Sequence, residues 1–572
     1  MGVPSYFAWI MKLRRKYQLK NILHPSLNRP TKRLYLDYNC GIHKACRQTK
    51  TNDLNDMINN CAALIEELLA LVKPTELLFI SIDGSVPMGK CKQQRYRRFK
   101  TVQEQRMIRE IKQKASDDQP VDFNMISPGT EFMIKLSDYI KVKIDQWKQK
   151  YPSIQFILSD SLIPGEGEQK IVQHMKASPP NSMDGVVIYG LDADLIFLSL
   201  GLHHPSMYLI RENVNKEHVE NQDHQFSVPD YIYLNIGDLR ENIIKLVTQS
   251  ENLIKLNKTE HEQYLTTMSV YSGDQIINDY IFINFLLGND FVSKIYSLSI
   301  REGSCEVLLQ IYRVCLRSQK QHLVTLDDND DVSINVNFLQ QMLTFLVEYE
   351  RNYWKDPPKI HVASLKKHLE LTETEEEIEK YQFIDATRQN LQLNLSDPNF
   401  RSKYYHRLFS LDSNCSLETN IKQICSRYWY ALRWVSRYYF RQCHDWDWYY
   451  RYEYAPLISD LLNYGANQIN ENTLATISKP IDVLHQLMII LPPSSFAFLP
   501  RMFKRILQSS QFSSFFPKYF QYHYYGHAFL WECPPKIPIL DNRSTKEMYD
   551  YILCHLNDEE NKNNHVGCLY VN

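Results

Sequence analysis

Four short apolar runs in the first third of the chain predict buried β-strands. They read RLYLD at 33–37, LLFISI at 77–82, IQFIL at 154–158 and GVVIY at 185–189. Such runs are typical of strands that are buried on both faces of a parallel sheet. Segments between them have helical periodicity, such as LNDMINNCAALIEELLALVK at 54–73, which Pro74 ends. The alternation predicts an α/β fold in which a mostly parallel central sheet carries helices on both faces.

The pattern changes in the second half of the chain. Residues from about 235 to 290 are helical in periodicity, and the region from about 318 to 400 carries the charge runs LDDNDDV and ETEEEIEKYQ. Residues 400–460 are crowded with tyrosine, tryptophan and arginine, and 484–500 is helical until a double proline. We therefore predict four parts: an N-terminal α/β domain at 1–317, a variable connector at 318–399, a helical aromatic-rich region at 400–545 packed on the first domain, and a frayed polar tail at 546–572.

Composition limits the class of protein further. The chain has 572 residues, of which 44% are hydrophobic, and its net charge is −1, so any nucleic-acid site must come from local clusters of charge. Twelve cysteines are scattered without a CxxC pair, which indicates reduced thiols and argues against a zinc site. No apolar run approaches the roughly 20 residues of a membrane span, and the N-terminus does not resemble a signal peptide. We expect a soluble intracellular protein.

Carboxylates follow the predicted strands directly. Four aspartates fall at or just past the C-terminal end of a strand: Asp37, Asp83, Asp160 and Asp192. In open α/β sheets, ligands bind at that edge. Asp194 follows Asp192 at a spacing that points both side chains to one side. Such carboxylates repel each other, and a divalent cation removes the repulsion. Alternatively, one aspartate caps the next helix and the other is solvated.

Two more acidic residues lie in the segment PGEGEQK at 164–170. On a regular helix, residues two apart point about 200° away from each other. Glu166 and Glu168 therefore face one site only if the helix starts irregularly, which the two glycines permit. Alternatively, the helix macrodipole alone favours these glutamates. Asp290 lies in a turn after Gly288, a predicted helix C-cap.

Together these positions form an all-oxygen set of seven carboxylates: Asp37, Asp83, Glu166, Glu168, Asp192, Asp194 and Asp290. Oxygen ligands suit hard divalent cations, and we expect Mg²⁺ or Mn²⁺. The set exceeds what one ion needs, which predicts two ions. Two ions about 4 Å apart activate a water and stabilise the leaving oxygen of a phosphodiester. No Ser/His/Asp or Cys/His constellation competes with this interpretation.

The segment KCKQQRYRRFK at 90–100 predicts a helix with one basic face. That face is made by residues spaced i, i+4, i+7 and i+8: Lys90, Gln94, Arg97 and Arg98. The helix begins shortly after Asp83, so the basic face lies beside the acidic site. Forked guanidinium groups and a lysine suit a terminal phosphate. Alternatively, the face is only solvated.

Flat side chains complete the candidate site. His43 follows Asp37 at the start of a predicted helix, and Trp446 and Trp448 lie in the aromatic-rich region. Flat side chains beside a phosphate pocket stack unpaired bases without reading their sequence. Most aromatic residues in 428–454 belong to the core, and we expect one of the two tryptophans to stack a base.

At this point the motifs resemble, in order, those of the XRN-type 5′→3′ exoribonucleases. Seven segments resemble the first conserved region of that family: MGVPSYFAWI, LYLDYNCGIH, IDGSVPMGKCKQQRYRRF, SPGTEFM, SDSLIPGEGEQKI, YGLDADLIFLSL and FLLGNDFVSKI. The second is resembled by RWVSRYYFRQCHDWDWYYRYEYAPLISDL, QLMIILPPSSFAFLP and WECPPKIPILD. The match covers most of residues 1–545 and corresponds to a short form without the long C-terminal extension.

The resemblance implies a PIN/FEN-like nuclease core, with a second region that completes the active-site pocket. It implies processive hydrolysis of single-stranded RNA from a 5′-monophosphate end, with Mg²⁺ and release of nucleoside 5′-monophosphates. By motif position, the seven carboxylates would be catalytic metal ligands, and Lys90, Gln94, Arg97 and Arg98 would hold the 5′-phosphate. His43 with Trp446 or Trp448 would stack the first base. Capped and triphosphate ends would be excluded by size.

The chain departs from the family at two places, and two other functions stay open. SVPMGKCK lacks the usual alanine-containing turn, and LGNDFVSKIYSLSI lacks the usual prolines. One alternative is a flap-type, structure-specific DNA nuclease, against which the aromatic second region argues. The other is a catalytically silent RNA-binding scaffold, against which the complete carboxylate set argues.

Overall fold

The computed structural model describes most of the chain. It covers residues 6–17, 19, 22–27, 29–49, 51–111, 121–213, 219–220, 226–227, 229–248, 271–327, 331–355, 393, 395–465, 468–471, 478–527, 529–562 and 564–572. The charge run ETEEEIEKYQ at 373–382 lies outside the described residues, as does most of the predicted connector beyond 355.

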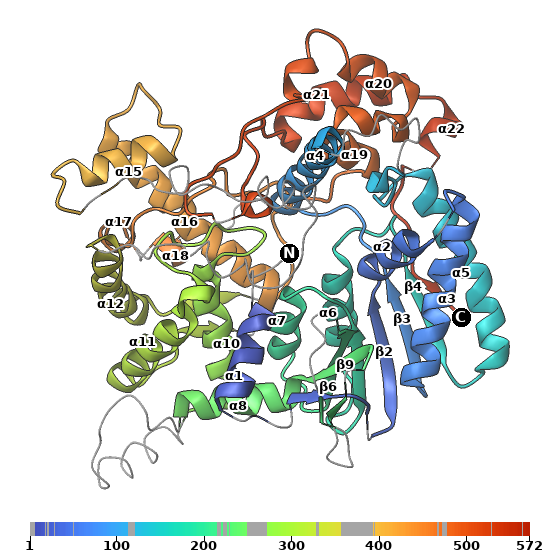
Figure 1. Ribbon diagram of the computed structural model, residues 1–572, viewed down its shortest axis with the longest axis horizontal. Helices are drawn as coiled ribbons and strands as arrows, with labels where there is room; N and C mark the ends of the chain where they lie inside the picture. Colours follow the sequence, from blue (N-terminus) through green and yellow to red (C-terminus); the bar gives the residue numbers. More distant parts are fainter. Residues whose placement is uncertain are drawn as a thin grey trace.

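An eight-stranded sheet forms the centre of the N-terminal half (Figure 1). Its order is β1-β9-β6-β5-β2-β3-β4-β12. The strands are β1 (Leu23–His24), β2 (Thr31–Asp37), β3 (Leu77–Ser81), β4 (Gln155–Ser159), β5 (Gly185–Tyr189), β6 (Met207–Glu212), β9 (Tyr231–Asn235) and β12 (Tyr570–Val571). The five strands β6-β5-β2-β3-β4 pair in parallel, and β1, β9 and β12 join antiparallel. The predicted mostly parallel sheet is confirmed.

Alternate residues of the central strands enter two separate cores. In β2, Leu34 and Leu36 face one core and Tyr35 faces the other, and all three are fully buried. This alternation follows from the period of two along a strand. Burying one such side chain stabilises the fold by about 1.5–3 kcal/mol. The apolar composition of these strands therefore requires a cover of helices on both faces.

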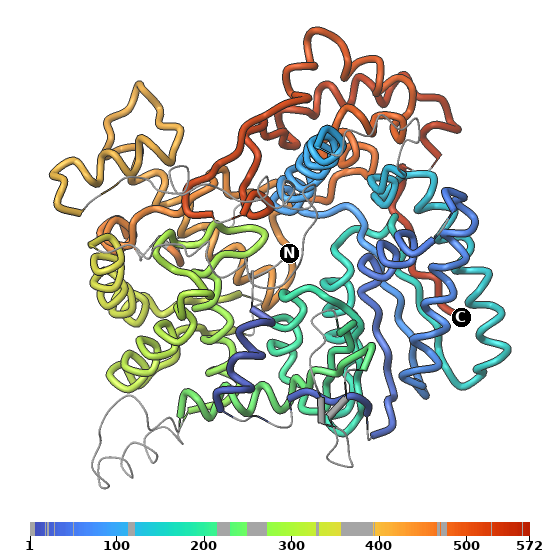
Figure 2. The backbone as a smooth tube through the Cα atoms, in the orientation of Figure 1, coloured from blue at the N-terminus to red at the C-terminus, as the bar shows by residue number. Residues whose placement is uncertain are grey.

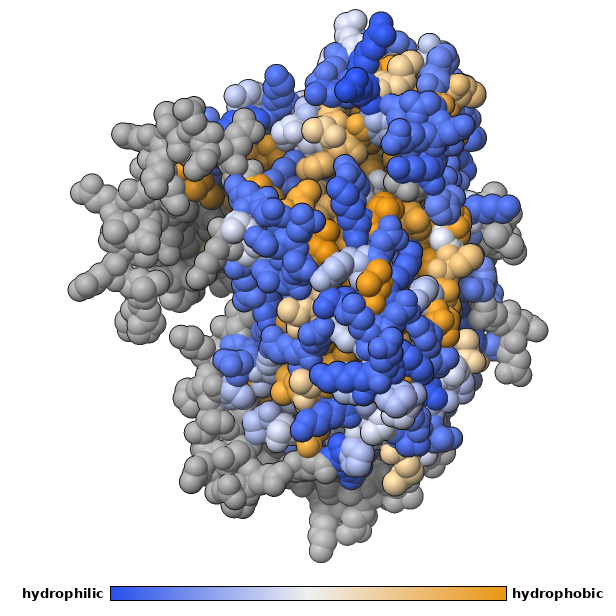
Figure 3. Space-filling model, turned by 90° about the vertical axis from the view of Figure 1, so that its right-hand side faces the viewer, coloured by the Kyte–Doolittle hydropathy of each residue, from blue (hydrophilic) through white to orange (hydrophobic). Residues whose placement is uncertain are grey.

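Helices provide that cover, as predicted. One face carries α2 (Asn39–Gln48), α3 (Leu54–Val72) and α5 (Glu131–Lys150). The other carries α1 (Tyr6–Lys16), α6 (Gly167–Ala177), α7 (Asp194–Gly201), α8 (Ile236–Thr248) and α10 (Gly273–Asn284). Figure 3 shows the molecule from the side of α3 and α5, where hydrophilic side chains dominate and hydrophobic ones are scattered between them. These two helices are amphipathic, so their apolar sides face the sheet.

The second half of the chain is mainly helical and packs against the α/β half. Its longer elements are α11 (Ser304–Gln319), α12 (Val336–Lys355), α15 (Phe400–Leu408), α16 (Leu417–Phe440), α17 (Ile458–Asn463), α19 (Val483–Ile490), α20 (Arg501–Leu507) and α21 (Asn542–Leu553). Its shorter elements are β10 (Val324–Leu326), β11 (Val332–Ile334), α18 (Gln468–Glu471) and α22 (Asp558–Asn561), whereas β7 (Val219–Glu220) and β8 (Phe226–Ser227) pair with each other in the α/β half. This arrangement confirms the predicted helical second region.

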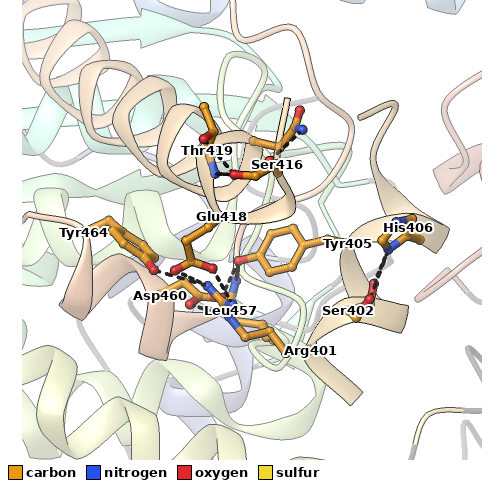
Figure 4. A network of polar contacts seen from close by, with 11 residues as sticks. Arg401, Ser402, Tyr405, His406, Ser416, Glu418, Thr419, Leu457, Asp460 and Tyr464 are labelled. Carbon is orange, nitrogen blue, oxygen red and sulfur yellow. Dashed lines mark hydrogen bonds and ion pairs between the residues drawn. The ribbon is translucent and has the colours of Figure 1, made fainter. Parts of the chain in front are cut away.

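A buried carboxylate ties three of these helices together (Figure 4). Arg401 of α15 donates to Asp460 Oδ1 of α17 at 2.9 Å and to Glu418 Oε2 of α16 at 2.8 Å. Tyr405 donates its hydroxyl hydrogen to Asp460 Oδ2 at 2.7 Å. Asp460 is 2% exposed, and both of its oxygens therefore have the partners that a buried charge needs.

Helix α4 (Met88–Ile111) connects the two halves of the molecule. It runs from the edge of the sheet to α19 and the C-terminal helices (Figure 1). Arg95, which is 1% exposed, donates to the carbonyl oxygens of Ile489 and Phe515. In front of the helix, the Val86 amide donates to Gln486 Oε1 at 2.7 Å. The C-terminal region is therefore built around the helix that carries the predicted basic face.

The predicted frayed tail is wrong. Residues after 545 continue helix α21, and the chain then returns to the sheet, where β12 pairs with β4 (Figure 2). Tyr570 donates its hydroxyl hydrogen to Asp145 at 2.5 Å. The tail is polar because β12 is an edge strand with one neighbour, and such strands need no continuous apolar pattern.

Two further findings concern the whole chain. All twelve cysteines are free thiols, as predicted. Among the described helices, none combines the length and apolarity that crossing a bilayer requires.

Candidate active site

Four of the predicted carboxylates lie at the C-terminal edge of the parallel strands. Asp37 is the last residue of β2, and Asp83 follows β3 by two residues. Asp192 and Asp194 follow β5, and Asp194 is the first residue of α7. Asp37 and Asp194 are buried, whereas Asp192 is exposed. Because β5, β2 and β3 are neighbours in the sheet, these residues come together from distant parts of the sequence.

The start of α6 lies against two of these strand ends. The Gly167 amide donates to Asp83 Oδ1 at 2.7 Å, and the Ser81 hydroxyl donates to the Gly167 carbonyl oxygen at 2.9 Å. A Cβ atom on Gly167 would lie 2.5 Å from Asp37 Oδ1. Only glycine therefore permits this close approach.

The irregular start of α6 is confirmed. Glu166 is the N-cap residue with extended backbone angles, and Glu168 lies in the first helical turn. Glu166 is 3% exposed and Glu168 is 7% exposed, so both carboxylates are buried. Helix-start glutamates that served only the macrodipole would be solvated. Their burial beside the strand ends favours a role in the site.

Lys90 joins the last predicted carboxylate to this group. Its ammonium group forms ion pairs with Glu166 and, at 2.7 Å, with Asp290 Oδ2. Asp290 follows the 3₁₀ turn η3 (Phe285–Leu287) and its C-cap, Gly288, where φ is +85°. Lys90 was predicted to bind phosphate with the rest of the basic face, and here it lies inside the acidic cluster.

Two tyrosines from the helical region close the cluster. The Tyr438 hydroxyl donates to Glu166 Oε1, and Tyr439 lies beside Asp194. Both are near the end of α16 and are almost fully buried. Sequence reasoning missed them, because the segment SRYYF is one of many tyrosine-rich stretches in a chain with 37 tyrosines.

The cluster is electrostatically crowded. Burial, Asp83 and Asp192 raise the pKa of Asp37 well above its usual value. Burial raises the pKa of Asp194 to about 7, with Asp290 adding to the shift. Burial, followed by the charge of Glu166, also raises the pKa of Glu168 well above its usual value. Lys90 has the opposite effect on one member: although burial opposes it, the ammonium group holds the pKa of Asp290 below its usual range.

The donor set fits a divalent cation in its chemistry. Glu168 Oε2 and Asp194 Oδ1 are buried and have no hydrogen-bond partner among the described residues. Buried carboxylate oxygens without donors are costly unless a cation accompanies them. Within the described part of the chain, however, no three acidic, histidine or cysteine residues converge as a ready-made metal site. Lys90 neutralises part of the charge instead.

The rest of the predicted basic face divides into buried and exposed members. Arg98 is 6% exposed and donates to Ser127 Oγ at 2.7 Å, and it also contacts Gln94, which is buried. Burial lowers the pKa of Arg98 to about 9, with Arg97 adding to the shift. Arg97 itself is exposed. The basic face thus has a buried arginine, Arg98, that Ser127 fixes in place, and an exposed arginine, Arg97, that is accessible to solvent.

His43 lies close to these arginines. It is in the middle of α2, so the prediction that it starts a helix is wrong by one turn. Burial, followed by Arg97 and Arg47, lowers the pKa of His43 to about 3. Its Nδ1 atom is buried without a hydrogen-bond partner in the part of the chain that the structure describes. A neutral imidazole ring is thus held beside the basic face.

The two candidate tryptophans have different surroundings. Trp448 packs against Trp434 and Tyr430, with ring centroids 5.1 and 5.3 Å apart. The Trp446 ring makes no contact with another ring among the described residues, and its carbonyl oxygen accepts from the Met88 amide at 2.8 Å. Met88 starts α4 two residues before Lys90. The backbone of Trp446 thus adjoins the start of α4.

Asp160 has another role, although it also follows a strand. Its Oδ1 atom accepts from the Leu162 amide at 3.0 Å, and its Oδ2 atom pairs with Lys141 at 3.4 Å. Asp160 thus caps its own loop and pairs with Lys141, outside the carboxylate cluster. This is the capping role that we gave as the alternative for an aspartate at a strand end.

Comparison with known families gives the decisive observation. Residues 1–213 match the family model described as XRN 5′-3′ exonuclease N-terminus. Residues 270–392 and 359–571 match the model described as Xrn1 helical domain. The chain belongs to the XRN family. The first match contains six of the eight strands of the central sheet, and the second contains most of the helices that follow α10.

Named relatives include several XRN proteins. The 5′-3′ exoribonuclease 1 of Saccharomyces cerevisiae is 26% identical over 99% of this chain and 44% of its own length. The 5′-3′ exoribonuclease 2 homolog of Drosophila melanogaster is 25% identical over the whole chain and 73% of its own length. The chain thus spans less than half of the yeast relative.

One solved structure resembles the fold weakly. The catalytic core of Rad2 in complex with DNA substrate is 14% identical, covers 58% of this chain and 76% of its own, and has a TM-score of 0.26. Because the TM-score is this low, we infer nothing about this XRN chain from the complex.

Proposed function

We propose that this protein is a 5′→3′ exoribonuclease that hydrolyses single-stranded RNA processively from a 5′-monophosphate end and releases nucleoside 5′-monophosphates. The observation that carries the proposal is the position of α4 in a member of the XRN family. Its first turns bring Lys90 into the acidic cluster, and its next turn presents Gln94, Arg97 and Arg98. One helix thus joins an acidic centre to a basic pocket, at a distance of about one to two helical turns.

The basic residues account for selection of the 5′ end. A terminal monophosphate offers several oxygens and about two charges, which suits forked guanidinium groups. Arg98 is held by Ser127 at 2.7 Å, so the wall of the pocket is rigid, and exposed Arg97 supplies the accessible charge. We expect such a wall to exclude a cap or a triphosphate by size.

His43 and Trp446 supply the flat surfaces for the first base. The imidazole ring of His43 is kept neutral beside the arginines, so the ring adds no charge to repel them. Trp446 adjoins the first turn of α4 through its bond to Met88. Stacking on two flat groups tolerates every base, which a processive exonuclease requires.

The reaction uses divalent cations, as membership of the family implies. We propose two Mg²⁺ ions, for which Mn²⁺ can substitute, held by the seven carboxylates Asp37, Asp83, Glu166, Glu168, Asp192, Asp194 and Asp290. When bound, the ions supply activation of water and neutralisation of the charge that develops on the phosphodiester. The chain itself restrains Glu166 through Lys90 and Tyr438 and fixes Asp83 through the Gly167 amide.

The direct test uses matched RNAs with 5′-monophosphate, 5′-hydroxyl or 5′-triphosphate ends, labelled at the 3′ end. In Mg²⁺ we expect rapid loss of the monophosphate RNA alone, and EDTA stops the reaction. Equal decay of all three RNAs would show that the basic residues do not select the 5′ end, and hydrolysis at the acidic centre would still stand. Absence of decay with intact binding would favour the scaffold. A preference for flapped DNA would favour the structure-specific DNA nuclease, which the names of the relatives do not support.

A further inference from the structure

A polar cavity lies on the outer side of the segment that follows α16. Its volume is about 250 Å³. Three arginines from separate parts of the chain line it, and so does the ring of one tryptophan: Arg427, Arg451, Arg543 and Trp448. Arg427 precedes Tyr438 by eleven residues on α16, which places it about 16 Å along the helix from the carboxylate cluster. The cavity is therefore separate from that cluster.

The acidic residues of the cavity are already occupied by neutral donors. Asp447 Oδ1 accepts from Asn542 Nδ2 at 2.8 Å, and Asp541 Oδ2 accepts from the Tyr449 hydroxyl at 3.0 Å. Asp445 Oδ1 accepts from the Ser478 hydroxyl at 3.1 Å. These bonds hold the three carboxylates against the wall of the cavity, and Arg543 lies close enough to Asp541 to interact with its charge.

Arg451 contacts the Tyr449 hydroxyl group, whereas the other two guanidinium groups have no such partner among the described residues. Arg427 and Arg543 are exposed, and neither makes a hydrogen bond or an ion pair with any residue that the structure describes. Trp448 packs its inner side against Trp434 and Tyr430 and lines the cavity with the rest of its surface. Unpaired guanidinium groups around a fixed indole ring match the phosphate and the base of a nucleotide.

The floor of this cavity also borders the proposed phosphate pocket. The Trp448 carbonyl oxygen lies 3.8 Å from the position of a Cβ atom on Gly89, the residue before Lys90. The same segment therefore has the start of α4 on one side and the three arginines on the other. A single strand that leaves the carboxylate cluster covers this distance in a few nucleotides.

We propose that this cavity binds a nucleotide of single-stranded RNA downstream of the 5′ end. The proposal rests on the proposed function, because it takes the substrate strand to leave the carboxylate cluster toward α16. The cavity then adds affinity for long RNA without touching the scissile phosphate. Its removal weakens binding of long substrates and leaves the shortest ones unaffected.

The test is a double variant, Arg427→Glu with Arg543→Glu, compared with Arg501→Glu/Arg505→Glu, which makes the same change of charge on exposed residues of α20. Binding of 5′-monophosphorylated RNAs of about 3 and about 12 nucleotides is measured by fluorescence anisotropy in EDTA. We expect the first variant to bind the longer RNA about 10-fold or more weakly and the trinucleotide as the wild type does. Loss of the contact with this one phosphate also reduces the slope of log K against log salt by about 0.7.

The outcomes separate this proposal from the proposed function. If both double variants bind the longer RNA as the wild type does, or weaken it equally, the downstream site is wrong. If the trinucleotide is weakened as much as the longer RNA, the cavity belongs to the 5′-end pocket and the proposal also fails. If the wild type hydrolyses no RNA in Mg²⁺ while the length-dependent loss of binding is found, the proposed function fails and the RNA site stands.

Discussion

At the scale of single residues, the carboxylates of the candidate site are held by specific partners. Glu166 accepts from Tyr438 and pairs with Lys90, and Asp83 accepts from the Gly167 amide. Burial opposes the charged form of Lys90, but its ion pairs with Asp290 and Glu166 raise the pKa of its ammonium group. These partners thus restrain the carboxylates that we propose as cation ligands.

Asp192 gives the clearest test of a single carboxylate. It is exposed at the end of β5, so Asp192→Ala removes a proposed metal ligand without opening a cavity. We expect loss of at least about 100-fold in the rate of RNA hydrolysis, with RNA binding unchanged. Single-turnover kinetics and anisotropy measure the two. Asp138→Ala, at an exposed aspartate of α5, serves as the control, and full activity of Asp192→Ala would contradict the metal assignment.

His485 predicts a pH effect on stability that is independent of catalysis. It is 3% exposed, stacks on Tyr549 and contacts the Thr545 hydroxyl at 2.8 Å. Burial lowers its pKa to about 4, so the unfolded chain binds more protons between pH 4 and about 6.5. The free energy of unfolding therefore falls as the pH drops through this range, by about 2 kcal/mol at pH 5.

The measurement compares wild type with His485→Gln in urea unfolding at pH 7.5 and pH 5. The variant cannot titrate, so it should lose about 2 kcal/mol less on acidification. His406→Gln, at an exposed histidine of α15, serves as the control. Equal acid sensitivity of wild type and His485→Gln would show that this histidine is not the cause.

At the scale of elements, the start of α6 decides the geometry of the site. Its first residue lies between the ends of β2 and β3 because it has no side chain. The sequence predicted that Glu166 and Glu168 share a site only through an irregular start, and this requirement is met. What the sequence could not predict is which strand end the helix touches, because that depends on the order of strands in the sheet.

Gly167→Ala tests this element. The added Cβ atom would lie 2.5 Å from Asp37 Oδ1 and must displace the helix or the carboxylate. We expect activity to fall by about 10²-fold, since a misplacement of about 1 Å has this effect. Gly201→Ala on α7 is the matched control, because its Cβ atom meets only Ile281 Cδ1 at an ordinary 3.4 Å. Normal activity of Gly167→Ala would contradict the described contact.

The elements also show where sequence patterns fail. The four apolar runs predicted β2, β3, β4 and β5 almost to the residue. The strands β6 and β9 were missed, because MYLIRE and YIYLN mix polar and apolar residues and so lack the continuous apolar run that marked the other strands. His43 was placed near a helix start, but its helix begins four residues earlier.

At the scale of the whole molecule, contacts distant in sequence complete the site. Tyr438 reaches Glu166 across 272 residues, and Gln486 bonds to Val86 across 400. Periodicity reports only local structure, so no pattern in the sequence could identify Tyr438 and Tyr439 as neighbours of the carboxylates. The split of the basic face, with Lys90 in the acidic cluster, also depends on this tertiary packing.

The C-terminal strand predicts a long-range effect on stability. The chain ends on the edge of the sheet, where Tyr570 pairs with Leu158 of β4 and bonds to Asp145. Deleting residues 564–572 removes these contacts and leaves the edge of β4 unpaired. We expect a loss of about 1–3 kcal/mol in the free energy of unfolding, with KM for RNA unchanged. Thermal unfolding and steady-state kinetics measure the two, and unchanged stability would contradict the described pairing.

The central claim is hydrolysis from the 5′ end at the acidic cluster, and the first product tests it most directly. A single-stranded RNA with a radiolabelled 5′-monophosphate is incubated with the wild type and with Asp192→Ala in Mg²⁺, and the earliest labelled product is identified. We predict a labelled nucleoside 5′-monophosphate from the wild type and no product from the variant. A labelled oligonucleotide or free phosphate as the first product would contradict the account.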